Sequence, residues 1–318
     1  IFERDLEEEI RHRHCVKADW PANYELGTPM GFRIEHDAAG ATLVTDVELF
    51  GTRSLAHRIT LRGEDDAIEV RIQLFKEDVR SPESIFLVMP VNVAAGWAGH
   101  FDLTGSVVAL DDDQMEGSCR DWASADSFAA IHDDEHGLTL FTPDCPLVMF
   151  GEFAFQRRRT AVPREAGPLL LAWPMNNMFD TNFRASQPGF IHLRFGLRTS
   201  GAFDAAQTLQ AARAFAVHPV AHPVNNLPDV TSGSLVEVTG DNVDLMHVKP
   251  ANDGRGAIVR LQNVGDTPTT ARVRLAGVDV AQAFATSILE EDGRAVSVVD
   301  GYAEMELTPR RITTLRLM

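Results

Sequence analysis

The sequence predicts an all-β protein of two domains, because strand-type patterns recur along most of its 318 residues. In residues 67–75, apolar and polar side chains alternate from Ile68 to Leu74, which is the period of a half-buried antiparallel strand. The same alternation returns in residues 190–198. Many short strands with turn signals between them are typical of a β-sandwich or a β-barrel, and not of alternating βαβ units.

Shorter apolar or alternating runs fill the space around these two strands. They cover residues 41–50, 55–62, 84–93, 101–110, 137–142 and 147–155. The first sixteen residues, with Leu6 and Ile10 among charged side chains, are either a short surface helix or an edge segment.

One internal segment has a good helix pattern. Asp204 can cap its start, and Gln207 occupies the capping-box position. Leu209, Ala212 and Phe215 then fall on one face. We predict a single helix of about three turns.

A Pro-rich stretch follows this helix and marks the domain boundary. Its prolines, which prevent a continuous helix or a central strand, are Pro219, Pro223 and Pro228. We therefore predict a large β-domain over residues 1–216, a linker over 217–233 and a small β-sandwich over 234–318.

Turn dipeptides divide the small domain into strands. Asp253-Gly254, Asp292-Gly293 and Asp300-Gly301 each separate apolar or alternating runs, as hairpin turns do. Residues 312–317 form the last predicted strand.

Charge and composition limit the classes of partner. With 29 Lys and Arg against 46 Asp and Glu, the net charge is −17, which argues against nucleic acid and against an anionic membrane surface. No apolar run approaches the roughly 20 residues that span a bilayer. The acidic start is unlike a signal peptide, and the missing initiator Met suggests a processed product or a piece of a longer polypeptide. Three widely spaced cysteines fit a reducing cytoplasm.

Three charged clusters are weak site candidates. His132 and His136 could share a metal ion on a helix, but the strand patterns around them favour a hairpin loop. Asp111 to Asp113 lack the ligand spacing of an EF-hand and favour a polar loop tip. Residues 157–159, three arginines, could hold an anion or make internal ion pairs, and we favour the ion pairs.

Two motifs combine amide, charged and aromatic side chains. Residues 173–189 carry Asn176, Asn177, Asp180, Asn182 and Gln187 among aromatic residues, and residues 117–122 carry Arg120, Asp121 and Trp122. Such a mixture suits a neutral, hydroxyl-rich ligand. The alternative is a long loop whose Asn and Asp side chains bond to their own backbone.

These motifs resemble the region downstream of the catalytic domain in glycoside hydrolase family 38, the α-mannosidases. The matching segments are residues 116–122, 136–147 and 175–189, followed in the tail by 248–254, 258–263, 288–293 and 307–317. The resemblance implies a large mutarotase-like antiparallel β-supersandwich followed by a small C-terminal β-sandwich. It also implies that the zinc ligands and the aspartate nucleophile lie in an upstream catalytic domain.

The predicted function follows from this resemblance. The chain is expected to help form the sugar pocket of a cytoplasmic α-mannosidase-like enzyme for a mannose-type saccharide, and to be inactive alone. We assign it no catalytic residue, no metal ligand and no cofactor of its own. The alternatives are a free-standing sugar mutarotase or epimerase, and a purely structural β-sandwich that meets no ligand.

Overall fold

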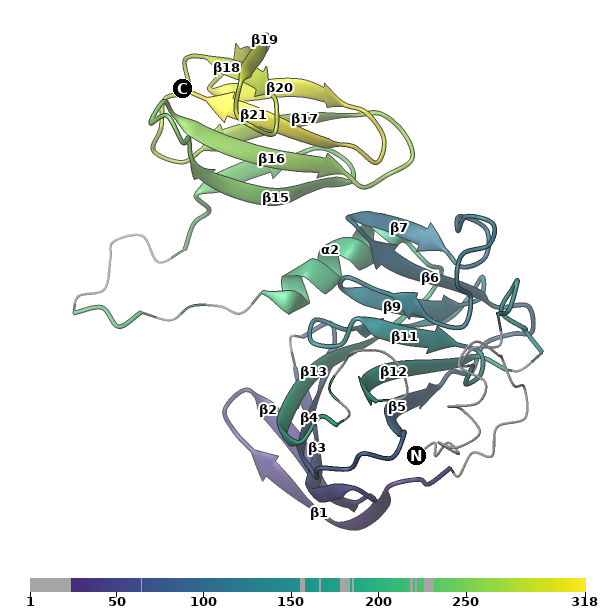
Figure 1. The fold of residues 1–318 in the computed structure, drawn as a ribbon. Coiled ribbons are helices and arrows are strands. Elements are labelled where there is room, and N and C mark those ends of the chain that lie inside the picture. Colours follow the sequence, from purple (N-terminus) through teal and green to yellow (C-terminus); the bar gives the residue numbers. More distant parts are fainter. Residues whose placement is uncertain are drawn as a thin grey trace. The chain divides into compact units, whose positions relative to one another are not determined.

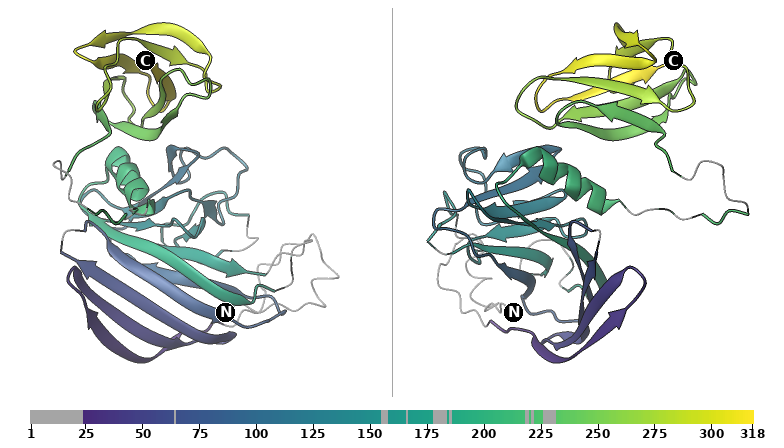
Figure 2. Two further views of the ribbon diagram at one scale, coloured as in Figure 1. Left: turned by 90° about the vertical axis from the view of Figure 1, so that its left-hand side faces the viewer. Right: turned by 180° about the vertical axis from the view of Figure 1, so that it is seen from behind.

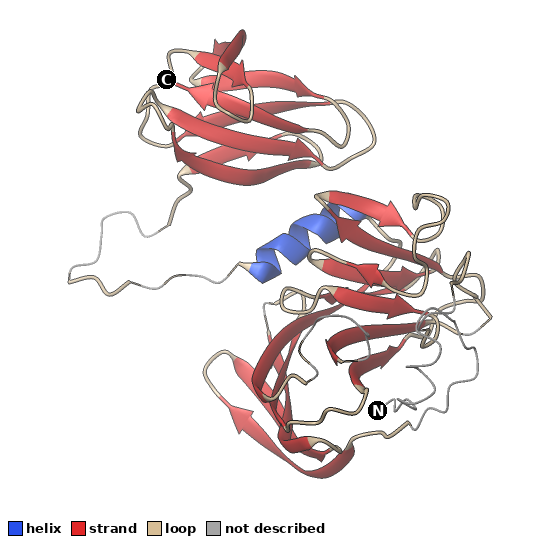
Figure 3. Cartoon of the chain, viewed as in Figure 1, coloured by secondary structure: helices blue, strands red, loops and turns tan. Residues whose placement is uncertain are grey.

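The protein is described by a computed structural model that covers residues 24–63, 65–154, 158–165, 167–177, 184, 186–217, 220, 222–225 and 232–318. Most of these residues lie in antiparallel strands, so the predicted all-β fold is confirmed (Figure 3). The chain divides into two compact units, Ile1–Phe203 with Ala212–Ala216 and Asp204–Ala211 with Val217–Met318. Within the described residues, no helix has the length and apolar character that crossing a bilayer requires.

The first unit contains a nine-stranded sheet in the order β1-β2-β3-β4-β13-β10-β9-β6-β7 (Figure 1). Its strands are β1 (Thr28–His36), β2 (Gly40–Glu48), β3 (Thr52–Arg62), β4 (Ile68–Lys76), β6 (Ala98–Leu103), β7 (Ser106–Ala109), β9 (Phe128–His132), β10 (Gly137–Phe141) and β13 (Gly189–Ser200). Figure 2 shows the purple N-terminal strands side by side in a curved sheet.

A four-stranded sheet in the order β5-β12-β11-β8 forms the second layer of this unit. Its strands are β5 (Ser84–Pro90), β8 (Ala123–Ser124), β11 (Leu147–Phe150) and β12 (Leu169–Asn176). Leu170, Ala172 and Val148 pack in one buried cluster with Ile72 and Phe195 of the large sheet. We call the face of the large sheet that carries Ile72 and Phe195 the inner face.

Cross-strand register shows which residues share the inner face. Ile34 pairs with Leu43, Leu43 with Ile59, Ile59 with Val70, and Val70 with Phe195. Directly paired residues project to the same side of a sheet, so this row runs from edge strand β1 into the core. The alternation predicted for β4 and β13 is therefore confirmed.

Helix α2 (Ala205–Ala216) begins where the sequence predicts. The Asp204 carboxylate accepts a hydrogen bond of 2.8 Å from the Gln207 amide, which satisfies one of the free N–H groups of the first turn. In the last turn, the Phe215 ring lies 5.4 Å from the Phe141 ring of β10. Phe141 pairs with Gly196 of β13. Because Gly196 has no side chain, both rings fit above it, whereas a Cβ at position 196 would collide with the rings of Phe141 and Phe215.

The second unit contains an eight-stranded sheet in the order β14-β17-β20-β19-β18-β21-β16-β15. Its strands are β14 (Val236–Thr239), β15 (Val243–Pro250), β16 (Ala257–Asn263), β17 (Thr269–Leu275), β18 (Ala283–Thr286), β19 (Asp292–Val299), β20 (Tyr302–Leu307) and β21 (Ile312–Leu317). Its core includes Val259, Leu261, Val273 and Leu315, all fully buried.

Two of the three predicted turns in this unit are confirmed, and one is wrong. Asp253-Gly254 lies between β15 and β16, and Asp300-Gly301 connects β19 to β20 with positive φ at both residues. Asp292 instead begins β19, where it pairs with Thr286. Its carboxylate accepts a hydrogen bond of 2.6 Å from Arg316, so an ion pair fixes it in the strand.

Candidate functional site

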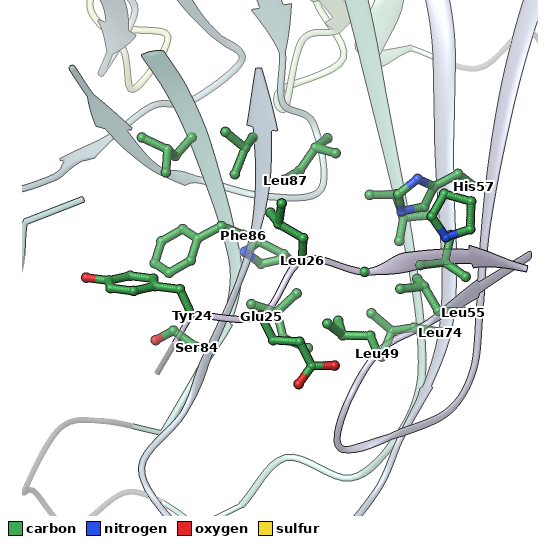
Figure 4. A pocket seen from close by; sticks show the side chains of 18 of the residues that line it. Tyr24, Glu25, Leu26, Leu49, Leu55, His57, Leu74, Ser84, Phe86 and Leu87 are labelled. Atoms are coloured by element: carbon green, nitrogen blue, oxygen red, sulfur yellow. The ribbon is translucent and has the colours of Figure 1, made fainter. Parts of the chain in front are cut away.

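An apolar pocket of about 410 Å³ opens in the first unit (Figure 4). One wall is the inner face of β2 to β4, with Val47, Ile59 and Leu74. The other wall comes from β5 and β12, where Phe86 and Leu171 line it. The sequence did not predict this pocket, because strand patterns show which residues face inward, but not where the two layers separate.

Few polar groups line the pocket. His57 is one, and burial lowers the pKa of its imidazole below the ordinary value, which favours the neutral ring. Glu25 is another, and its carboxylate accepts a hydrogen bond of 3.2 Å from the Phe50 amide. A hydroxyl-rich molecule would leave most of its hydroxyls without partners here. The pocket therefore suits an apolar occupant.

The predicted amide motif begins at the end of β12, beside this pocket. Asn176 is the last residue of β12 and pairs with Ser84, which lines the pocket. Gln187 is exposed just before β13. Asp180 and Asn182 lie outside the described residues.

Asn177 connects β12 to a loop almost a hundred residues earlier in the chain. Its side-chain oxygen accepts a hydrogen bond of 2.6 Å from the Glu83 amide, and its nitrogen donates to the carbonyls of Val79 and Ser81. Three such bonds fix the loop before β5. This side chain therefore has a role in positioning the loop.

A buried ion pair lies next to Asn177. The Lys76 ammonium is 2.5 Å from the Glu83 carboxylate, and both side chains are almost fully buried. Lys76 also donates to the Gly51 carbonyl at 2.9 Å. Burial raises the pKa of the Glu83 carboxyl, and the bond from Lys76 opposes that rise. The sequence did carry a signal for this pair, because Lys76 continues the inward-facing series of even-numbered residues in β4.

Arg120 and Asp121 form ion pairs that hold neighbouring loops. Arg120 lies 3.3 Å from the Asp111 carboxylate, which also pairs with Arg164 at 3.0 Å. Asp121 accepts hydrogen bonds from the backbone amides of residues 158 and 159 and pairs with the Arg159 side chain at 3.4 Å. Arg159 thus makes internal ion pairs, as expected for the arginine run, whereas Arg157 lies outside the described residues.

Trp122 joins the two predicted motifs through a series of aromatic rings. Its ring lies 5.8 Å from that of Trp173, which stacks on Phe86 at 5.6 Å. Phe86 meets Phe153 edge-on at 5.3 Å, and Phe153 meets Tyr24 at 6.1 Å. The rings therefore connect the 117–122 motif to the mouth of the pocket.

The acidic segment with two histidines is a hairpin loop between β9 and β10, as expected. The Asp133 amide donates to the His136 carbonyl at 2.9 Å. Backbone amides of Ala94, Glu135 and His136 lower the pKa of the Asp133 carboxyl to about 2. Across the described ranges, no group of three or more His, Cys, Asp or Glu side chains is arranged to hold a metal ion.

The architecture defines a class of protein, a two-unit antiparallel β protein with a sandwich at its C-terminal end. Residues 242–315 match the family model described as the glycosyl hydrolases family 38 C-terminal beta sandwich domain. The predicted resemblance to the downstream region of family 38 is thereby confirmed. No curated protein sequence matches the chain.

Solved structures resemble a larger part of the chain. A glycosyl hydrolase family 38 protein from Enterococcus faecalis matches with a TM-score of 0.67 and 14% identity, over 92% of this chain and 37% of its own. An α-mannosidase from Enterococcus faecalis V583 matches with a TM-score of 0.69 and 13% identity, over 92% and 35%. At such identities the likeness shows the fold. This chain spans about a third of the length of either structure.

Proposed function

We propose that this chain is the downstream, non-catalytic part of an α-mannosidase-like glycoside hydrolase and binds a mannose-type saccharide beside the catalytic domain. The observation that carries the proposal is the coverage: 92% of this chain matches little more than a third of a family 38 protein. The partner is the upstream catalytic domain of the same polypeptide. A cytoplasmic location fits the free thiols of Cys119 and Cys145.

The proposal divides the chemistry between the two parts. Retaining hydrolysis of a glycoside requires two suitably spaced carboxyl groups, and the family resemblance places the nucleophile and the zinc ion upstream. We assign this chain no catalytic group, so the isolated chain is expected to be inactive. Its contribution is binding and orientation of the saccharide.

Within this chain we assign the sugar contacts to the amide motif and its aromatic neighbour. Asn176 and Gln187, with Asp180 and Asn182, supply donors and acceptors for paired hydroxyls, and Trp122 supplies an apolar face for a sugar ring. The side chains that bond to the protein itself position these groups. They are Asn177, Arg120 and Asp121.

A free-standing mutarotase is the alternative class, and the pocket argues against it. Mutarotation requires an acid and a base that move protons at the anomeric carbon and the ring oxygen. His57 and Glu25 both line the pocket, but its other walls are mostly apolar. A monosaccharide bound there would lose the hydrogen bonds that its hydroxyls make with water.

The length of the natural polypeptide tests the proposal directly. An antibody against this chain would be used to measure the subunit mass in cells of the source organism. We expect a mass well above the 35.0 kDa of this sequence. A subunit mass near 35 kDa would contradict the proposal and favour a free-standing protein.

Sugar contacts are tested on the full-length enzyme with Asn176→Ala and Gln187→Ala. We expect each variant to raise KM for an aryl α-mannoside several-fold, because each removes a hydrogen bond to a hydroxyl. Asn225→Ala, in the exposed Pro-rich segment, is the matched control. Unchanged KM in both variants would favour the purely structural sandwich.

A further inference from the structure

Two histidines meet on the face of the large sheet that is opposite the inner face. Phe101, Ala129 and Ile131 belong to the buried core cluster of the first unit. His100 and His132 alternate with these residues along β6 and β9, so they project to the other side. The His100 Nδ1 and His132 Nε2 atoms are 2.9 Å apart, which is the distance of a hydrogen bond.

The Phe203 ring covers both imidazoles. Its centroid lies 4.5 Å from that of His100, with an angle of 21° between the rings, and 4.5 Å from that of His132, with an angle of 7°. The two imidazoles are inclined to each other by only 24°. One ring can stack on two others only while those two lie nearly in one plane. The hydrogen bond that aligns the histidines therefore also makes the platform on which Phe203 rests.

This hydrogen bond has a direction that the neighbouring backbone fixes. The His132 Nδ1 atom lies 3.2 Å from the Asp133 carbonyl, which can only accept, so Nδ1 carries the proton of the neutral ring. The His132 Nε2 atom then accepts the N–H of His100 Nδ1. A positive charge on His100 leaves this bond in place, because a charged donor strengthens it. The same charge also favours the stack under the Phe203 ring.

A second positive charge breaks the arrangement. Once both rings are imidazolium, each of the two facing nitrogens carries an N–H and neither has a lone pair that can accept. Two like charges then lie on rings whose centroids are 5.0 Å apart. The imidazoles must turn or separate, and the flat platform under Phe203 is lost.

Charged groups on the surrounding elements act on the pair in opposite directions. They are Asp102 on β6, Asp133 and Asp134 in the loop after β9, Arg198 on β13 and Asp204, the residue after Phe203. Backbone amides already bond to the carboxylates of Asp102, Asp133 and Asp204. Burial lowers the pKa of His132 more than Asp133 and Asp134 raise it, which favours its neutral ring at neutral pH.

We propose that His100, His132 and Phe203 form an acid-sensitive latch, which is closed while the two imidazoles carry at most one added proton and opens when a second proton separates them. Both protons come from the solvent. Phe203 directly precedes Asp204, whose carboxylate caps α2, so its release reaches the connection from β13 to α2 along the chain. All three side chains belong to the first unit, and the inference stands independently of the carbohydrate proposal.

Histidine titration in the full-length chain tests the latch. Chain labelled with ¹³C at histidine Cε1 is followed by NMR from about pH 8 to about pH 4.5. We expect His100 and His132 to titrate in two coupled steps that are more than about one pH unit apart. The ring current of Phe203 shifts both resonances upfield relative to Phe203→Ala. This upfield shift should persist through the upper step and disappear in the lower one.

A matched pair of variants assigns the lower step to the imidazole pair. His132→Gln removes the site of the second proton but keeps a side chain that can accept from His100, so the upfield shift of His100 should persist at every pH. His136→Gln removes an imidazole that is 72% exposed in the same loop, and it should change neither step. His100→Gln repeats the test from the other strand. Circular dichroism verifies that each variant keeps the sheet structure.

Three results would overturn the latch. Independent titration of both rings at their ordinary pKa would mean that they share no hydrogen bond. An upfield shift that persists through the lower step would mean that Phe203 stays in place when the second proton binds. Loss of the lower step in His136→Gln would assign that step to the acidic loop instead of the pair.

Discussion

The nine-stranded sheet has two halves that carry the same kind of inner face but differ in what covers it. On the central strand β13, Phe195 is fully buried under the four-stranded sheet. At the β1 end of the same cross-strand row, Ile34 is largely exposed. Both residues come from alternating strands, so the local pattern does not distinguish them. The difference comes from the second layer, which is narrower than the first.

The pocket forms where the second layer of the first unit ends. The four-stranded sheet ends at β5, while the large sheet continues through β3, β2 and β1. Inner-face side chains beyond β5 have no opposing layer among the described residues, and the pocket lies at that step. Apolar area left in water contributes nothing to stability until an occupant removes it from solvent.

Truncation of matched phenylalanines gives the largest predicted contrast between the two halves. Phe195→Ala should lower the free energy of unfolding by about 3–5 kcal/mol, because it leaves a cavity in the covered core. Phe32→Ala on the same inner face should cost under about 0.5 kcal/mol, unless a cover buries it. Urea unfolding followed by circular dichroism measures both. A loss of about 2 kcal/mol or more for Phe32→Ala would mean that the β1 half is covered in solution.

Loss of the buried ion pair at the end of β4 is expected to cause the second-largest decrease in the free energy of unfolding. Glu83→Gln keeps the shape of the side chain but leaves the Lys76 ammonium buried without a counter-charge, so we expect a loss of about 3–5 kcal/mol. Replacing both residues, Lys76→Met with Glu83→Leu, should recover most of that loss. Unfolding in urea gives both values. A small effect of Glu83→Gln would show that water reaches the pair and that the pocket extends to it.

Sequence patterns predicted the fold well where it depends on local chemistry. Alternation located β4 and β13, and the Asp204 cap located the start of α2. The β1 strand was not predicted, because Pro29 and Gly31 interrupt its alternation, and the structure accommodates them with a register shift. Asp292-Gly293 has the composition of a turn, but a distant arginine fixes Asp292 inside a strand.

The candidate site was less predictable, because its geometry depends on contacts between distant segments. Composition placed Asn177 with the other polar residues of its motif. Its partners, however, lie in the loop before β5, almost a hundred residues away. Trp122 and Trp173 were named in separate motifs, and only the packing of β12 against its neighbours brings their rings together. Which of these groups meets a sugar stays a prediction.

Asn177→Ala, at the boundary between the covered and uncovered halves, should cause an intermediate decrease in the free energy of unfolding. It leaves the Glu83 amide and two carbonyls without their side-chain partner, so we expect a loss of about 1–3 kcal/mol in thermal unfolding. The control Asn225→Ala should stay within about 0.5 kcal/mol. A full-length enzyme in which Asn177→Ala raises KM while stability is unchanged would contradict the positioning role and assign this amide to the sugar.

Titration of His57 gives the smallest effect and reports most directly on the uncovered half. Burial lowers the pKa of His57 below 6.5, so below that pH the unfolded chain binds a proton that the folded chain does not. Stability should therefore fall as pH decreases from about 6.5, and His57→Gln should reduce that slope. The other titratable side chains along the pocket, Glu25 and Tyr24, are unchanged in this comparison. Measured by NMR, the pKa of His57 should lie below its ordinary value, because the imidazole is desolvated on the wall of the pocket. An ordinary pKa for His57, with no change of the pH slope in His57→Gln, would mean that water reaches this ring and that the pocket is hydrated.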